Sequence, residues 1–229
     1  MSKRFTEVES KVDKKKVYSV AEAVTALKAA ATAKFDETIE LHFNLGIDPK
    51  MGDQQIRGTL TLPHGSGKTK KVMAFVDAAN VDAAKAAGAD FIGDEATIEA
   101  IGKTGKIDFD VAVAVPAMMA KLAKAAKVLG PRGLMPNPKT DTVGPNIAKI
   151  IQEQKAGKLS FKNDATGNVH MIVGKASFEA KKLEDNLNMA VEAIRKVKPA
   201  TSKGVYIKSC TVTSTMGPAI KLDAGAAVV

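Results

Sequence analysis

The sequence predicts an α/β protein in which a parallel α/β segment in the middle separates two outer segments that mix strands and helices. Near both ends of the chain, strand-like runs alternate polar and apolar residues, which is typical of a sheet with one face on a core and one face free. In the middle, continuous apolar runs alternate with alanine-rich helical stretches, which indicates a parallel sheet covered by helices. The 229 residues suffice for one large domain or two of moderate size.

The first outer segment begins with a helix signal and continues into two strands. Ser19-Val-Ala-Glu22 is a capping-box pattern and predicts a helix over residues 19–33. Residues 38–45 alternate without interruption, so they predict a strand with one buried side. The polar side of this strand carries Thr38, Glu40, His42 and Asn44. Residues 55–62 read as a second strand.

The middle segment repeats strand and helix at short intervals. Residues 71–76 and 111–115 are continuous apolar runs bounded by turns, as expected for strands buried on both faces. Alanine-rich stretches lie between and after these runs and predict helices over residues 81–87, 97–102, 117–128 and 146–155.

The last segment returns to alternating strands. Residues 159–163 and 168–173 flank a polar turn that contains glycine, which predicts a hairpin. A long amphipathic helix over residues 178–196 and a final strand over residues 205–215 follow.

The two outer segments are short. Residues 1–67 and 159–229 are each thin for an independent core, so their joining into one domain, with residues 68–158 inserted, is physically allowed but not required by the patterns. The glycines at 65–67 and Gly157 would then mark two neighbouring crossings between domains, a natural hinge.

The composition narrows the class of protein. The net charge of +9 favours a polyanionic partner, such as nucleic acid, acidic lipid or acidic protein. The longest apolar stretch, residues 111–120, is about half a membrane span and contains Pro116, so no transmembrane helix is expected. Residues 1–16 are rich in lysine without the apolar region of a secretory signal, and we expect a cytoplasmic protein.

The residues that usually carry metal or covalent chemistry are sparse. The single cysteine, Cys210, permits no internal disulfide or multi-cysteine zinc site, and the three histidines stand in no ligand motif. Cys210 lies inside a strand pattern, which favours a small core residue over a nucleophile. Because no catalytic set is recognisable, we expect neither a metal nor a cofactor, and no enzyme.

His64-Gly-Ser-Gly-Lys-Thr69 suggests a phosphate-binding loop and therefore a nucleotide-dependent enzyme. That loop needs a glycine at position 62 and a helix directly after Thr69, but position 62 is Leu62 and residues 70–76 look like a strand. A flexible basic linker is the preferred interpretation. Measured ATP or GTP turnover would separate the two.

A second candidate is the proline-rich stretch at residues 127–139. Its three prolines and two glycines prevent a helix and predict a stiff, extended loop that presents Arg132 and Lys139. Residue chemistry alone leaves two interpretations open: a rigid connection, or a preshaped basic loop that contacts phosphates.

The third candidate is formed by the polar sides of the first and last strands. Ser209, Thr211, Thr213 and Thr215 share one parity, as do the polar residues of 38–45. If both strands lie in one sheet, their hydroxyl and carboxylate groups can recognise ribose 2′-hydroxyls, while Lys34, Lys203 and Lys208 neutralise phosphates. A solvated sheet surface and a generic DNA- or polyanion-binding surface remain alternatives.

Several longer motifs resemble a known family. Leu129-Gly-Pro-Arg-Gly-Leu-Met-Pro-Asn137 and Thr215-Met-Gly217 are the most specific. The other matching stretches are Lys34-Phe-Asp-Glu-Thr38, Asn44-Leu-Gly46, Leu62-Pro-His-Gly65, Ala83-Ala-Lys-Ala-Ala-Gly88 and Lys203-Gly-Val-Tyr-Ile-Lys208. Over almost its whole length the chain resembles the bacterial large-subunit ribosomal protein L-one family.

This resemblance implies a discontinuous two-layer α+β domain, residues 1–67 and 159–229, that binds RNA, with a Rossmann-like three-layer αβα domain, residues 68–158, inserted. It implies a ribosomal protein that binds the lateral stalk of large-subunit ribosomal RNA and assists release of deacylated tRNA from the exit site. It also implies repression of translation from the protein's own mRNA through a similar RNA fold. A free monomer in the cytoplasm is expected.

The family's RNA-binding motifs can be carried over residue by residue. The implied contact residues are Lys34, Phe35, Thr38, Glu40, Ser209, Thr215, Met216 and Gly217. Arg132, Lys139, Lys203 and Lys208 are candidates for supplementary contacts.

Overall fold

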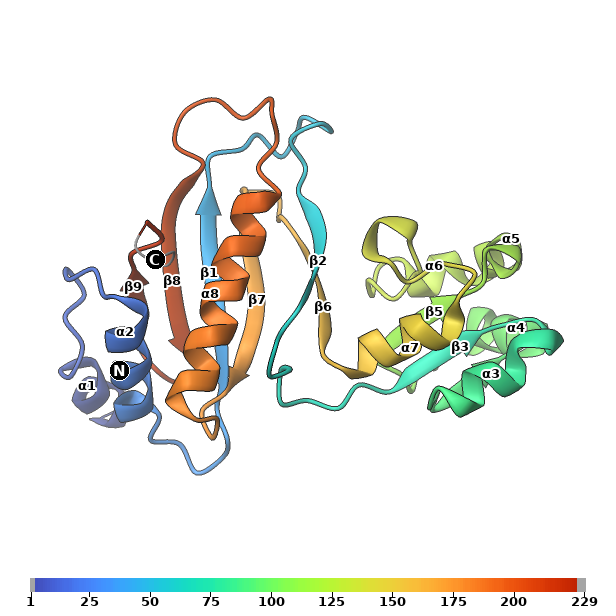
Figure 1. Cartoon of the computed structure of the whole chain (residues 1–229), viewed down its shortest axis with the longest axis horizontal. Coiled ribbons are helices and arrows are strands. Elements are labelled where there is room, and N and C mark those ends of the chain that lie inside the picture. Colours follow the sequence, from blue (N-terminus) through green and yellow to red (C-terminus); the bar gives the residue numbers. More distant parts are fainter. Residues whose placement is uncertain (1–2, 226–229) are drawn as a thin grey trace. The chain divides into compact units, whose positions relative to one another are not determined.

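The computed structural model describes residues 3–225 and confirms the α/β class (Figure 1). The chain divides into two compact units: unit 1 comprises Met1–Gly67 and Leu159–Val229, and unit 2 comprises Lys68–Lys158. Unit 1 therefore draws on both ends of the sequence, and the chain passes between the units twice.

Unit 1 is built on a four-stranded antiparallel sheet with the order β7-β1-β8-β9. Its strands are β1 (Thr38–Leu45), β7 (Asn168–Lys175), β8 (Ile207–Ser214) and β9 (Ile220–Leu222). Strand β1 has the predicted bounds and lies between two strands from the far end of the chain (Figure 1). The polar sides of β1 and β8 thus share one sheet, as the third sequence candidate required.

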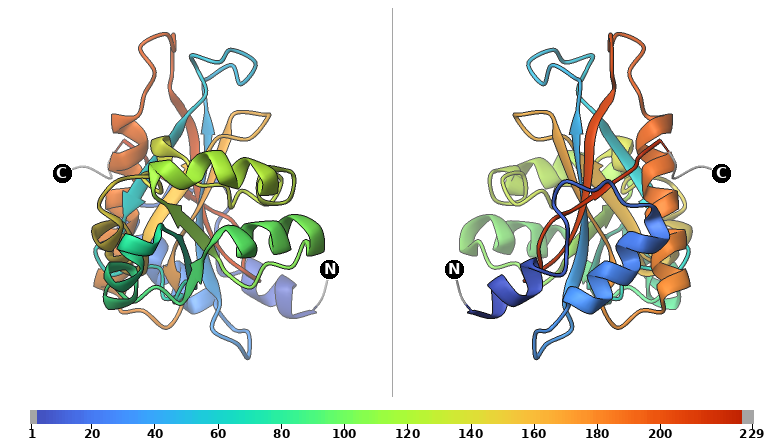
Figure 2. Two further views of the ribbon diagram at one scale, coloured as in Figure 1. Left: turned by 90° about the vertical axis from the view of Figure 1, so that its right-hand side faces the viewer. Right: turned by 90° about the vertical axis from the view of Figure 1, so that its left-hand side faces the viewer.

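One face of this sheet is covered by two helices, α2 (Val20–Ala30) and α8 (Ala180–Lys196), which contact each other and lie on the same side of the strands (Figure 2, right). Alternate residues of β1, from Ile39 to Leu45, are buried against them. The predicted capping box is confirmed, because Glu22 N–H donates to the Ser19 hydroxyl and the Glu22 carboxylate accepts from Ser19 N–H. Helix α2 ends at Ala30, earlier than the predicted 33, where an extended loop begins.

The predicted hairpin of residues 159–173 is wrong. Strand β6 (Lys158–Lys162) pairs with β2 (Arg57–Thr61) in a separate two-stranded sheet, and it meets β7 only at the bridge Asn163–Val169. The reason lies at Asn163, whose backbone N–H donates to Ile56 O and whose side-chain oxygen accepts from Ile56 N–H. This pair of bonds holds the end of β6 to the start of β2.

Unit 2 contains a three-stranded parallel sheet with the order β4-β3-β5. The strands are β3 (Val72–Phe75), β4 (Phe91–Gly93) and β5 (Val111–Ala114), and the regular helices are α3 (Val81–Ala86), α4 (Glu95–Thr104) and α7 (Ile147–Lys155). All four residues of β3 are buried, and neighbouring residues of the strand belong to two different apolar clusters. Both faces of this sheet therefore carry a core.

The helix predicted over residues 117–128 is interrupted. Residues 116–129 form four short pieces in which 3₁₀ and α turns alternate: η2 (Pro116–Met118), α5 (Met119–Leu122), η3 (Ala123–Ala125) and α6 (Ala126–Leu129). The buried residues Leu122, Ala125 and Leu129 are spaced by three and then four. A 3₁₀ turn places residues i and i+3 in line, so the local tightening keeps this apolar row toward the core.

Within residues 3–225, five short elements were not predicted: helix α1 (Lys3–Glu9), strands β4 and β9, and the 3₁₀ helices η1 (Ala78–Asn80) and η4 (Pro138–Thr140). Each has three to seven residues, too few for a hydrophobic period to show. Elsewhere, strands and helices begin and end within a few residues of the predicted positions.

The segment His64–Thr69 is not a phosphate-binding loop, because strand β3 follows it at Val72. Nor is its first half a flexible linker. His64 N–H donates to the side-chain oxygen of Asn186, and the Asn186 amide donates to Gly65 O, at 3.2 and 3.0 Å. Ser66 is buried. Across residues 3–225 no helix is long and apolar enough to span a bilayer.

Candidate nucleic-acid interface

The face of the unit 1 sheet opposite α2 and α8, here called the open face, carries rows of polar side chains. In one row the register aligns His170 of β7, His42 of β1, Thr211 of β8 and Lys221 of β9. In the rows beside it, Glu40 lies opposite Thr213 and Asn44 lies opposite Ser209. The polar residues of β1 are half-buried rather than covered by a second layer. The open face therefore presents side chains that can form hydrogen bonds, at positions fixed by the sheet.

At one end of the open face, two loops meet. The first, residues 31–37, precedes β1, and the second, residues 215–217, follows β8; together they are called the paired loops. Thr38 N–H donates to the Thr215 hydroxyl oxygen at 2.9 Å, and Thr215 N–H donates to Thr38 O at 3.0 Å. Lys175 also donates to the Thr38 hydroxyl at 2.8 Å. The predicted residues Thr38 and Thr215 are therefore direct neighbours.

The paired loops present two apolar side chains to solvent. Phe35 is 53% exposed and Met216 is 45% exposed, which is unusual for large apolar residues. Lys34 is exposed beside Phe35 and has no bonding partner within residues 3–225. Aromatic side chains can stack on bases and a lysine can attract phosphate, so this end carries groups that can contact RNA.

Glu37, which sequence analysis did not select, connects the paired loops through its buried side chain. It is 1% exposed, and its carboxylate accepts hydrogen bonds from Ala33 N–H, the Ser214 hydroxyl and Met216 N–H. Burial by itself would raise the pKa of the Glu37 carboxyl, but these three donors and the nearby charge of Arg4 hold that pKa below its usual value. The group is therefore ionised at neutral pH.

Arg4, from α1, bridges the same loops on the outside. Its guanidinium donates to the Thr32 hydroxyl at 3.2 Å and to Met216 O at 3.1 Å. A cation thus lies beside the Phe35–Met216 end of the open face. No local pattern in the sequence would have pointed to Arg4 or Glu37, because their partners lie far along the chain.

Two histidines meet in the middle of the open face. The Nδ1 atoms of His42 and His170 are 2.9 Å apart, so one must donate and the other accept. His42 Nε2 lies 3.2 Å from the Thr213 hydroxyl. Partial burial and the charge of His170 lower the pKa of the His42 imidazole, against the opposing effect of Glu40. The neutral form of His42 is therefore favoured.

The predicted residues do not all gather at the paired loops. Ser209 lies opposite Asn44, at the other end of the β1–β8 pair from Thr215, about 20 Å away along the strand. Lys208 precedes Ser209 and so lies at that same end of the β1–β8 pair, whereas Lys34 precedes β1 at the end of the paired loops. Five residues of extended strand, Cys210 to Ser214, separate Ser209 from Thr215, a length that sequence parity does not reveal.

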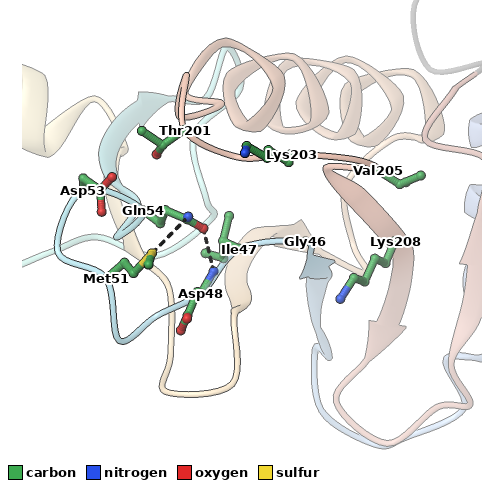
Figure 3. Close-up of a pocket in the computed structure, with 10 residues that line it drawn as sticks. All are labelled: Gly46, Ile47, Asp48, Met51, Asp53, Gln54, Thr201, Lys203, Val205 and Lys208. Atoms are coloured by element: carbon green, nitrogen blue, oxygen red, sulfur yellow. Dashed lines mark hydrogen bonds between the residues drawn. The ribbon is translucent and has the colours of Figure 1, made fainter.

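Lys203 and Lys208 instead line an open hollow of about 710 Å³ together with the loop of residues 46–54 (Figure 3). Figure 3 shows the lysines on the side formed by residues 201–208, and Asp48 and Asp53 on the opposite side. Two carboxylates thus balance two amines around this hollow. Its charge does not by itself favour a polyanion.

Arg132 and Lys139 lie in unit 2 and are exposed. Their loop is ordered by Asn137, whose side chain accepts from Lys139 N–H and whose backbone N–H donates to the Thr142 hydroxyl, both at 2.8 Å. The prediction of an extended loop without helix is wrong in part, because α6 continues to Leu129, residues 130–133 form a turn and Pro138–Thr140 form the 3₁₀ helix η4. This local order does not distinguish a rigid connection from a phosphate-binding loop.

Other site chemistry is lacking in the described chain. Cys210 is buried in the core, as predicted, and burial raises the pKa of its thiol to about 12. Among residues 3–225, no cluster of three or more histidine, cysteine, aspartate or glutamate side chains could hold a metal ion.

Comparison with known proteins agrees with this picture. Residues 27–218 match the "Ribosomal protein L1p/L10e family". The large ribosomal subunit protein uL1 of Mesoplasma florum is 52% identical over 223 residues, which cover 97% of this chain and 98% of that protein. The uL1 proteins of Deinococcus radiodurans and Kosmotoga olearia are each 50% identical, over 98% and 97% of this chain and 97% and 96% of their own lengths. The chain therefore belongs to the ribosomal protein L1p/L10e family.

Proposed function

We propose that this protein is a structural constituent of the large ribosomal subunit that binds the lateral stalk of large-subunit ribosomal RNA through unit 1. Relatives that match it over nearly their full length carry the name of a large-subunit protein. It is then a cytoplasmic, ribosome-bound protein without an enzymatic reaction. The observation that most supports RNA as the ligand is the open face, where free polar groups and exposed apolar side chains adjoin on a rigid sheet.

The proposed contacts are made by side chains of the open face that are available to a ligand. The hydroxyls of Ser209 and Thr211 have no hydrogen-bonding partner within residues 3–225, so they are available to ribose or phosphate oxygens. The Glu40 side chain is 44% exposed and can accept from a 2′-hydroxyl or a base amine. These bonds gain strength where the interface excludes water.

The Thr215 hydroxyl is not entirely free for RNA, because it also forms hydrogen bonds within the protein. Its Oγ1 accepts from Thr38 N–H and lies 3.2 Å from Thr38 O, to which it donates. One lone pair remains for a ribose hydroxyl. We propose that Thr215 both contacts RNA and holds the start of β1 in place.

The protein's own packing also requires glycine at position 217. A Cβ atom at position 217 would lie 2.4 Å from the Ser214 hydroxyl oxygen, so only glycine leaves that hydroxyl its place. The absence of a side chain then allows RNA to approach the backbone closely as well.

Two finer functions are part of the proposal. A protein that holds the stalk can assist release of deacylated tRNA from the exit site as the stalk moves. The same surface would bind a similar fold in the protein's own mRNA and repress its translation. A competition titration tests the second function: unlabelled mRNA fragment should displace stalk RNA with a single-site curve.

The assignment of the site is tested by Thr215→Ala in a stalk RNA titration. We expect binding about 5- to 150-fold weaker, because an unpaired buried partner costs about 1–3 kcal/mol, with little change in salt dependence. Glu40→Ala should behave alike. Thr25→Ala is the matched control, since Thr25 is exposed on α2, behind the sheet. Wild-type affinity of Thr215→Ala would show that the site assignment is wrong.

The alternative of a generic DNA- or polyanion-binding protein is tested by titrating the wild-type protein with stalk RNA and with duplex DNA. A surface that reads 2′-hydroxyls should prefer stalk RNA strongly over duplex DNA at moderate salt. Equal affinities for the two would favour the alternative.

A further inference from the structure

Glu37 is a charged residue whose side chain is buried in unit 1. It is almost fully buried, although it belongs to the loop before β1. Burying a carboxylate is costly unless every bond to water is replaced. Here three protein donors replace that water, at 3.1 Å from Ala33 N, 2.7 Å from Ser214 Oγ and 3.0 Å from Met216 N.

These donors come from two places that are far apart in sequence. Ala33 belongs to the loop before β1, whereas Ser214 and Met216 lie at the end of β8 and in the turn after it. The carboxylate therefore spans the paired loops and sets the distance between their backbones. Glu37 Oε1 accepts a hydrogen bond from the first loop, and Oε2 accepts from Ser214 and from the second loop.

The side chains that these loops present cannot hold themselves in place. Phe35 and Met216 are about half exposed, so packing does not fix them. Neither lies in a helix or a strand. Gly217 fits the same arrangement, because a side chain there would displace the Ser214 hydroxyl that donates to Glu37.

We propose that Glu37 is a positioning residue for RNA binding: it holds the loop of Phe35 and the turn of Met216 at the spacing that the RNA requires. This inference rests on the proposed function. Glu37 is too deeply buried to touch the ligand, so it acts through the two loops. Order that exists before binding lowers the entropy lost on binding, and this raises affinity without a new contact.

The test is Glu37→Gln, which keeps the shape of the side chain and removes its charge. An amide has one acceptor oxygen and one NH₂ group, so either orientation turns a donor toward a backbone N–H, that of Ala33 or that of Met216. We expect stalk RNA affinity to fall about tenfold, the size of the entropy cost of ordering one or two side chains on binding. The slope of affinity against salt should not change, since Glu37 contacts no phosphate.

Two further measurements separate positioning from general stability. Hydrogen exchange of the free variant should quicken at the amide of Ala33 or Met216 while the amides of β1 keep their protection. Calorimetry should show that the lost affinity is entropic. Asn186→Leu serves as the control, because Asn186 is a fully buried polar residue of α8 that binds Gly65 O and Val173 O behind the sheet. It should lower stability and leave RNA affinity unchanged.

The outcomes keep the two proposals apart. If Thr215→Ala weakens binding and Glu37→Gln does not, the positioning role is wrong and the proposed function stands. If neither variant affects binding, both the site assignment at the paired loops and the positioning role are wrong, whereas the proposed function fails only if the wild-type protein does not bind stalk RNA. If Glu37→Gln and Asn186→Leu weaken binding in proportion to their loss of stability, Glu37 has only a structural role and the inference is overturned.

Discussion

The sheet of unit 1 has three strands of eight residues, whereas no strand in the sheet of unit 2 exceeds four, and the two sheets also differ in how many of their faces are covered. In β1 of unit 1, buried and half-buried residues alternate, and one face stays open. In β3 of unit 2, every residue is buried, and its neighbours divide between two apolar clusters. Coverage of the faces therefore decides where each unit can bind. Unit 1 can use a sheet face, whereas unit 2 has only its loops and helix surfaces.

The most sensitive test of this difference compares neighbouring positions in the two strands. In β1, Phe43→Ala should lower the free energy of unfolding by about 3–5 kcal/mol, whereas His42→Ala should cost far less. In β3, both neighbours should matter: about 3–5 kcal/mol for Phe75→Ala, and about 2 kcal/mol for Val72→Ala, which deletes two buried methyl groups.

Chemical denaturation of the full chain, followed by probes in each unit, measures these losses. An effect of His42→Ala as large as that of Phe43→Ala would contradict an open face on the unit 1 sheet. A neutral Val72→Ala would contradict a core on both faces in unit 2.

A smaller effect is expected in the response to pH. The three strands of unit 2 contain no titratable residue, whereas the open face carries His42, which faces His170, Glu40 and, across β8, Lys221. The pKa of His42 is lowered from 6.5 on folding, so below that pH the unfolded chain binds the proton more readily than the folded one. Stability should therefore fall as pH drops below about 6.5.

The variant His42→Gln keeps a polar side chain and cannot titrate in this range. Its free energy of unfolding should fall less steeply than that of the wild type between about pH 6.5 and pH 5. Parallel pH profiles for the two proteins would show that His42 contributes nothing to the difference between the units.

The smallest effect concerns a single charge at the paired loops. Lys34→Ala should reduce the slope of log affinity against log salt by about 0.7–0.9, the value for one lost phosphate contact, with a modest loss of affinity. Lys28→Ala is the matched control, because Lys28 is exposed on α2, behind the sheet. Titration of stalk RNA at several salt concentrations makes the measurement. An equal change in both variants would mean that the RNA does not prefer the open face.

The parts of the fold that could be predicted from sequence are those whose signal is local. The uninterrupted alternation of residues 38–45 defined a strand with the correct bounds, and the capping box marked the start of α2 within one residue. The hairpin failed because pairing is not a local property. The turn between residues 163 and 168 resembles a hairpin turn, but β6 finds its partner about a hundred residues earlier in β2.

The candidate site shows the same limit. Shared parity along the two strands indicated the hydroxyl-rich side correctly, because side chains alternate with a period of two. Glu37 escaped notice because it precedes the alternating strand and looks like any acidic loop residue, while two of its donors lie about 180 residues away. Lys34, Lys203 and Lys208 were selected because they lie near the two strands in sequence. Lys34 precedes β1 and the other two lie near the start of β8, and only the antiparallel pairing of β1 with β8 puts those starts at opposite ends.

The position of β1 between strands from the far end of the chain has a consequence during synthesis. Its first partner, β7, emerges from the ribosome about 120 residues after Leu45, which at 5–20 residues per second is a delay of roughly ten seconds. Unit 2 is complete before then, while the apolar side of β1 still waits for its neighbours. A nascent chain of this protein should therefore require shielding, by a chaperone or by the tunnel, until its last fifty residues arrive.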